Sequence, residues 1–167
     1  MSANTKKLLN ETGLFDQTVL DLARRAGAAA LELEKEGDDG LDAEKYQKAL
    51  EVRGTASALR ELARWTPDTP LPRNRRDMEI RVSNQCLFGK QDDGATPERP
   101  KSEVIFQASS NSNRLLLNVA RWLHALSECA FWRGELNTDP RLFVLMQHIQ
   151  KLADEVTEAT ADNAECS

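Results

Sequence analysis

Histidine, cysteine and aromatic side chains are scarce in this chain of 167 residues. It contains 2 histidines, 3 cysteines, 3 tryptophans, 1 tyrosine and 5 phenylalanines. The cysteines are odd in number and form no Cys-x-x-Cys pair, which argues against a zinc knuckle or a dithiol redox motif. They are widely spaced, at Cys86, Cys129 and Cys166. This usage is typical of a reducing compartment, so we expect a cytoplasmic protein.

Glycine-rich loops and long apolar runs are also missing. The 8 glycines are scattered, so the sequence holds no phosphate-binding loop, and it holds no Gly-x-Ser-x-Gly nucleophile elbow. No apolar run approaches the roughly 20 residues that cross a bilayer. The two leucines before Asn10 are too few for the core of a signal peptide. These absences predict a protein with no membrane association and no bound cofactor.

The charge balance is acidic. The formal net charge is -5 and the isoelectric point is near 5.2, which disfavours attraction of the whole molecule to nucleic acid. Hydrophobic residues make up 40% of the chain and charged residues 29%, a balance that suits a small helical bundle with solvated outer faces. A length of 167 residues supports a single domain, residues 1–167.

Two long helical patterns fill residues 14–65. Apolar residues at spacings of three and four predict a first helix over 14–36, and Asp42 is a good N-cap for a second helix that ends near Trp65. The Gly-Asp-Asp-Gly sequence at 37–40 predicts the turn between them, so the two helices form an antiparallel hairpin. The alanine-rich stripe of the first helix permits close approach, so we also expect homodimerisation through it.

Residues 111–160 predict a second helical hairpin. The first of its helices is apolar over most of its circumference, so we expect it to be the central helix of the fold. Thr138 is the predicted cap of the last helix, with Asp139 and Pro140 in its first turn. The predicted stripe of that helix consists of Phe143, Met146, Ile149, Ala153 and Val156. Residues 161–167 form an acidic tail that we expect to be disordered.

Residues 66–110 differ from both hairpins. Five of the 6 prolines lie there, which predicts an irregular insertion or linker. Within it, residues 78–83 alternate apolar and polar, which indicates a short strand that would pair with residues 104–107 as a β-hairpin or across a dimer. A short helix over 73–87 is the alternative. The predicted fold is therefore mainly α: a four-helix antiparallel bundle of two helical hairpins with a Pro-rich insertion.

One pair of residues could contribute to a metal site. His124 and Glu128 are one helical turn apart, but two ligands do not make a site. Neither histidine has a glutamate three residues before it, as in di-iron bundles. We therefore expect no metal.

A second pair resembles a catalytic motif. Arg141 and His148 are separated by six residues near one face of the last predicted helix. This spacing resembles the Arg-x(4–6)-His element of the HEPN ribonuclease superfamily, whose members are helical bundles. The resemblance implies that Arg141 binds phosphate or stabilises the transition state and that His148 transfers a proton. The alternative is that Arg141 is a first-turn surface residue and His148 flanks the apolar stripe.

Two groups of residues are candidates for binding a partner. The arginines of the insertion could hold a partner's carboxylates or the phosphates of nucleic acid; they are Arg73, Arg75, Arg76 and Arg81. Trp132 and Arg133 lie near the bend of the second hairpin and are either an exposed anchor or part of the core.

The sequence favours a non-enzymatic interaction protein. Helical stripes, acidic charge and the lack of a competent catalytic constellation suit a small cytoplasmic adaptor or inhibitor of bacterial or phage-like type. It would bind another protein through its helical faces and the Arg-bearing insertion. One alternative is a nucleic-acid-associated regulator that uses Arg73 to Arg81. The other is a HEPN-like ribonuclease that uses Arg141 and His148.

Overall fold

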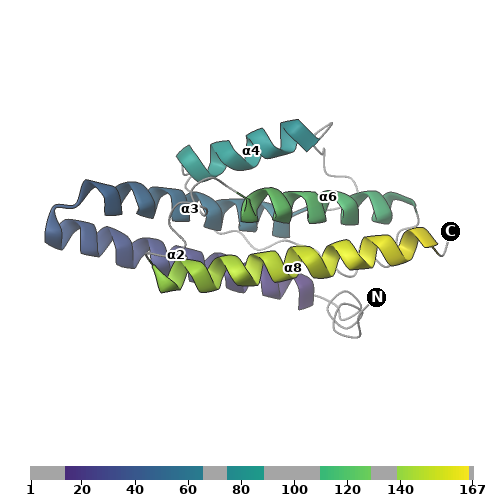
Figure 1. The fold of residues 1–167 in the computed structure, drawn as a ribbon, viewed down its shortest axis with the longest axis horizontal. Helices are drawn as coiled ribbons and strands as arrows, with labels where there is room; N and C mark the ends of the chain where they lie inside the picture. Colours follow the sequence, from purple (N-terminus) through teal and green to yellow (C-terminus); the bar gives the residue numbers. More distant parts are fainter. Residues whose placement is uncertain (1–13, 66–74, 89–109, 129–138, 166–167) are drawn as a thin grey trace.

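The computed structural model describes residues 14–65, 75–88, 110–128 and 139–165, and the secondary structure of these residues is helical. The five helices are α2 (Leu14–Gly40), α3 (Ala43–Ala63), α4 (Arg75–Phe88), α6 (Ser110–Ser127) and α8 (Pro140–Glu165). The prediction of a mainly α protein is confirmed. The helices form three layers, with α2 and α8 in one, α3 and α6 in the next and α4 on the far side (Figure 1). No helix of the described residues is long and apolar enough to cross a membrane.

The turn between α2 and α3 lies later than the sequence predicted, because α2 continues through the Gly-Asp-Asp-Gly sequence to Gly40. Leu41 follows with φ of 50°, and the Asp42 amide donates to the Gly37 carbonyl at 2.9 Å. This is the helix-ending arrangement that glycine usually provides, here with a leucine in the left-handed position. Gly37 is needed instead for close approach, since a Cβ there would lie 3.3 Å from the Tyr46 ring and from the Asp42 carbonyl oxygen.

The start of α3 is as predicted. The Asp42 side chain accepts hydrogen bonds from the Glu44 and Lys45 amides and so satisfies two of the free donors at the helix start. Ala23, Ala26 and Ala30 of α2 are buried where α2 packs along α3. This part of the alanine-rich stripe is therefore covered by the chain's own second helix, and homodimerisation stays a prediction.

The central helix is α3 rather than α6. Six consecutive residues of α3, 54–59, are buried, because α2, α4 and α6 each contact a different side of it. The α6 helix is also well buried, and its Trp122 donates from Nε1 to the Ala58 carbonyl at 3.1 Å. Trp65 packs edge-on against Trp122 with ring centroids 4.9 Å apart. The segment that directly follows α3 thus meets α6 through a pair of indole rings.

The insertion contributes a helix to the core. Residues 78–83 lie inside α4, so the strand prediction is wrong and the helical alternative describes this segment. Met78 and Val82, one turn apart, are buried against α3 and α6, and this burial overrides the weak period-two signal. The predicted partner strand at 104–107 lies outside the described residues.

The α8 helix differs from its prediction at both ends. Asp139 is its N-cap, with Oδ1 accepting from the Arg141 amide at 2.9 Å, and Pro140 is its first residue. The predicted cap, Thr138, lies outside the described residues. Leu142 and Leu145 are buried in place of Phe143 and Met146, so the stripe is rotated in the first two turns. The helix continues to Glu165, through most of the segment that we expected to be a disordered tail.

Candidate functional site

A surface groove follows the boundary between α2 and α8. Three cavities line up along it, with volumes of 390, 310 and 440 Å³. Arg25 and His148 line both of the first two cavities, and Arg141 lines both of the last two, so neighbouring cavities share part of their lining. Early residues of α2 face late residues of α8 across it, because the two helices run in opposite directions (Figure 1). We call this depression the α2–α8 groove.

The floor of the groove is apolar. It is made by side chains that are 2–7% exposed, namely Leu22, Ala29, Leu33, Leu145 and Leu152. Val144, which is 47% exposed, and the exposed Ala28 add apolar surface beside this floor in the middle cavity. Most of the rim is charged. The groove thus combines buried apolar surface with exposed groups of both signs.

Arg141 lies toward one end of the groove and pairs there with three carboxylates. Its Nη1 donates to Glu32 at 2.8 Å and to Glu36 at 3.0 Å, while Nε and Nη2 donate to Asp139 at 3.0 and 2.7 Å. Each nitrogen of the guanidinium is therefore bonded to an acid. Because Asp139 also caps α8, this cluster fastens the start of α8 to the second half of α2.

The charges of the cluster stabilise one another. Hydrogen bonds from Arg141 hold the pKa of Asp139 below its ordinary value. The hydrogen bond from Lys45 and, to a smaller extent, the hydrogen bond from Arg141 lower the pKa of Glu36. The same contacts, led by the bond to Asp139, raise the pKa of Arg141. Because their pKa values are lowered, Asp139 and Glu36 are ionised at neutral pH and carry the negative charges that pair with Arg141.

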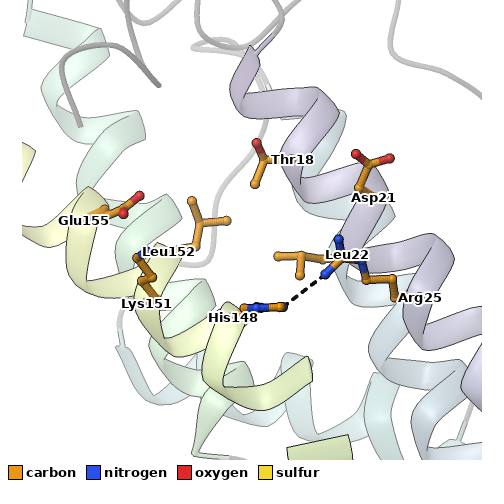
Figure 2. A pocket seen from close by; sticks show the side chains of 8 residues that line it. All are labelled: Thr18, Asp21, Leu22, Arg25, His148, Lys151, Leu152 and Glu155. Carbon is orange, nitrogen blue, oxygen red and sulfur yellow. Dashed lines mark hydrogen bonds between the residues drawn. The ribbon is translucent and has the colours of Figure 1, made fainter. Parts of the chain in front are cut away.

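A second polar group lies at the other end of the groove. Arg25 Nη1 lies 3.1 Å from His148 Nδ1, across the gap between α2 and α8 (Figure 2). A guanidinium can only donate, so Nδ1 is the acceptor and the imidazole is the neutral tautomer that carries its proton on Nε2. Thr18, Asp21, Lys151 and Glu155 surround this pair.

The structure places Arg141 and His148 in the same 310 Å³ cavity. Both side chains already form hydrogen bonds within the protein. The nitrogens of Arg141 are bonded to carboxylates, and the one imidazole lone pair of His148 accepts from Arg25. A phosphate-binding arginine needs free donors and a general base needs a free lone pair. This geometry favours a structural role for Arg141 and a hydrogen-bonding role for His148.

The structure describes the side chains of two arginines of the insertion, Arg76 and Arg81. Arg73 lies outside the described residues, as does the side chain of Arg75, the first residue of α4. Arg76 is exposed. Arg81 pairs with Glu61 and lies over the ring of Trp122, with its guanidinium carbon 5.9 Å from the ring centroid. Arg81 thus connects α4 to α3 and α6, although its side chain is 49% exposed.

Trp132 and Arg133 lie outside the described residues. His124 Nε2 lies 2.9 Å from the Thr157 hydroxyl, a contact that connects α6 to α8. Within the described ranges, no three His, Cys, Asp or Glu side chains are grouped as metal ligands.

Sequence reasoning missed Arg25 and Lys151 as site residues. Both are single cations on long helices, and nothing in their local pattern distinguishes them from solvated surface charge. The signal that identifies them is the packing of α8 against α2, which brings them to one cavity. The chain matches no protein-family model, no curated protein and no solved structure in the comparisons made.

Proposed function

We propose that the protein is a non-enzymatic interaction module, an adaptor or inhibitor that binds an amphipathic helix of another protein in the α2–α8 groove. The observation that carries this proposal is the row of three adjacent cavities between α2 and α8. Their lining residues extend along α8 from Asp139 to Glu155, about 24 Å at 1.5 Å per residue. That length accommodates about four turns of a bound helix.

The distribution of side chains supports a helical ligand. Helix-binding grooves offer an apolar floor to anchors at i, i+3, i+4 and i+7, and their charged rims align the ligand. Here Val144 and Ala28 lie at the middle of the groove. We expect the partner's apolar stripe to cover these two side chains.

The charges of the rim indicate the flanks of the partner helix. Arg25 and Lys151 lie at one end of the groove, while Glu32 and Glu36 lie at the other, where they already pair with Arg141. A partner helix with an acidic residue toward the Arg25 end is complementary to this rim. The charge pattern of the partner helix would determine the direction in which it binds more than the affinity of binding.

Site-specific photo-crosslinking tests the proposal. A photoreactive residue at Val144 samples the groove, and one at Ile80, which is 50% exposed on α4, samples the opposite layer with equal access to solvent. In lysate of the native host, we expect the Val144 position to crosslink one protein that survives nuclease treatment. Peptide mapping should place the crosslink in an amphipathic helical segment. Val144→Lys should then abolish binding of the partner, whereas Ile80→Lys should leave it unchanged.

Crosslinks from Ile80 alone would move the docking surface to α4 and its arginines. Crosslinks from both positions to many proteins would reject specific binding. Partners that vanish with nuclease would favour the nucleic-acid alternative, for which the exposed Arg76 is the first residue to reverse in charge.

The ribonuclease alternative has one observation in its favour, the shared cavity of Arg141 and His148. It requires Arg141 to leave its carboxylates before it binds a phosphate. RNA cleavage that is lost in His148→Ala would support this alternative. Cleavage that is absent, or unchanged by that substitution, would remove it.

A further inference from the structure

We propose that the contact between Arg25 and His148 is a pH-sensitive gate across the α2–α8 groove, closed when His148 is neutral and open when it is protonated. The two side chains come from opposite helices, and Arg25 Nη1 lies 3.1 Å from His148 Nδ1 (Figure 2). Both residues line the 390 Å³ cavity and the 310 Å³ cavity, so their contact lies where the two linings overlap. The gate needs no second protein and does not depend on the proposed partner helix.

The contact requires a neutral imidazole. A guanidinium has donors only, so Nδ1 of His148 accepts with its lone pair. A proton on Nδ1 occupies that lone pair and adds a positive charge opposite the positive charge of Arg25. The hydrogen bond is then lost and the two cations repel each other, so the side chains separate. An imidazole takes up its proton between about pH 8 and pH 5, which places this change near physiological pH.

The charged groups around His148 do not compensate its protonation. Those that line the two cavities with it are Asp21, Arg25 and Glu32 from α2, and Arg141, Lys151 and Glu155 from α8. The Asp21 carboxylate is paired with Arg24 at 2.7 Å, and Glu32 is paired with Arg141 at 2.8 Å. In the part of the chain that the structure describes, no carboxylate forms an ion pair with Arg25 or His148. Protonation of His148 therefore leaves two neighbouring cations without an acid between them.

The other histidine of the chain makes the opposite kind of contact. His124 Nε2 lies 2.9 Å from the Thr157 hydroxyl. That hydroxyl donates its one hydrogen to the Ala153 carbonyl at 2.8 Å, so it accepts from Nε2–H of His124. A second proton on the His124 ring goes to Nδ1 and leaves Nε2–H in place. The contact between α6 and α8 is therefore kept at both ends of the pH range, whereas the contact between α2 and α8 is not.

The Arg141 cluster is also retained over this range. The pKa values of Asp139 and Glu36 lie below their ordinary values of 3.8 and 4.5, so both carboxylates stay ionised at pH 5. The start of α8 consequently remains paired with α2 while the contact farther along the groove is lost. An open gate removes the side-chain bridge between two of the three cavities. Easier entry of a partner helix at lower pH is a consequence that rests on the proposed function.

The order of the Arg25 side chain tests the gate without a partner. Nitrogen-15 relaxation of the arginine Nε–H groups in the full chain is measured at pH 8 and at pH 5. We expect the order parameter of Arg25 to fall from about 0.8 to below about 0.6, because an exposed side chain that loses its contact becomes mobile. Arg141 is the internal reference, and its order parameter should stay the same at both pH values.

Two matched variants assign the change to one imidazole. His148→Gln offers an amide oxygen as an acceptor and takes up no proton, so the order parameter of Arg25 should be the same at pH 8 and pH 5. His124→Gln is the control, because it removes the only other histidine of the chain. It should leave the fall in the order parameter of Arg25 as large as in the original protein.

Three outcomes would overturn the inference. The first is an order parameter of Arg25 that is equal at the two pH values in the original protein. The second is a fall that persists in His148→Gln or disappears in His124→Gln. The third is an equal fall at Arg141, which would indicate general loosening of the fold. Failure to find a partner by crosslinking from Val144 would count against the proposed function only, since none of these measurements includes a partner.

Discussion

The two sides of α2 are packed in opposite ways. Toward α3 the helix presents small side chains, Ala23, Ala26 and Ala30, all fully buried. Toward α8 it presents Arg25 and Glu32, whose contacts reach across a gap that remains open as a groove. Small side chains let two helix backbones approach closely, whereas long charged ones hold the helices apart. One helix therefore supplies both a closed boundary that stabilises the fold and an open boundary that can bind.

Stability and binding therefore depend on different residues on the two sides of α2. The closed boundary contains the apolar area that drives folding, and its side chains have no access to ligand. The open boundary is fastened at one end by the Arg141 cluster and leaves Arg25, Lys151 and Val144 accessible at the surface. Substitutions on the two sides should consequently have effects of very different size.

The largest effect is expected in the closed part of the molecule. Leu59→Ala removes a fully buried side chain in the second half of α3 and should lower the free energy of unfolding by about 2–5 kcal/mol. Leu126→Ala in α6 should fall in the same range. Leu50→Ala on α3, where the side chain is 45% exposed, should change it by less than about 0.5 kcal/mol. Urea unfolding measures all three, and equal values at 59 and 50 would show that α3 is not central.

A smaller effect should distinguish the two sides of α2 directly. Ala26→Leu adds three carbons at a fully buried position against α3 and should cost about 1–3 kcal/mol of unfolding free energy. Ala28→Leu, two residues later and exposed at the groove, should change it by no more than about 0.5 kcal/mol. If both substitutions lower the free energy of unfolding equally, the groove is as tightly packed as the α2–α3 boundary. The proposed difference between the two sides of α2 would then be wrong.

The smallest of the three effects concerns Asp139, which caps α8 and pairs with Arg141 beside the groove. Asp139→Ala removes the cap of α8 and should cost about 0.5–2 kcal/mol at neutral pH. Asp139→Asn keeps a capping oxygen but removes the charge that pairs with Arg141, so it should cost less.

The contribution of these ion pairs to the free energy of unfolding should depend on pH in a defined direction. The pKa values of Asp139 and Glu36 are lowered on folding from their ordinary values of 3.8 and 4.5. Their charges therefore stabilise the folded state above those values, and the contribution is lost as the pH falls through the lower folded-state values. The stability difference between the original protein and Asp139→Asn should shrink below about pH 3.8. A difference that stays constant from pH 7 to pH 3 would show that the ion pair contributes nothing.

Local patterns predicted most of the helices and much of the core. The α2 stripe from Phe15 to Leu33 is buried as its spacing indicated, and Asp42 caps α3 as its position before a helical run indicated. Such features depend on a few neighbouring residues and on the 3.6-residue period, which a sequence displays directly. The strand prediction at 78–83 failed because six alternating residues do not distinguish a strand from a helix that buries one residue per turn.

Errors in the core followed from packing between distant segments. The sequence favoured Phe143 and Met146 as the first core positions of α8, yet Leu142 and Leu145 occupy them. Both pairs have helical spacing, so the choice depends on which face of α8 meets its neighbours. The same uncertainty made α6 look central, because its apolar circumference was visible in the sequence and the surroundings of α3 were not.

The candidate site was the least predictable part. Arg141 and His148 were chosen for their spacing, and the structure does bring them to one cavity. Glu32 and Glu36, which pair with Arg141, and Arg25, which meets His148, come from α2, more than 100 residues earlier in the chain, and they change what each residue can do. No pattern within α8 reveals that Arg141 meets three carboxylates or that His148 meets Arg25.

The amino-acid sequence alone determined that the chain is helical, acidic and organised as amphipathic segments, since these properties follow from composition and local periodicity. Tertiary structure alone decided which helix is central, which side of α2 is closed and which charges meet across the α2–α8 groove. The physical reason is that helix formation depends on residues three or four apart. Side-chain size and charge pairing between distant segments instead set the distance and direction at which those helices pack.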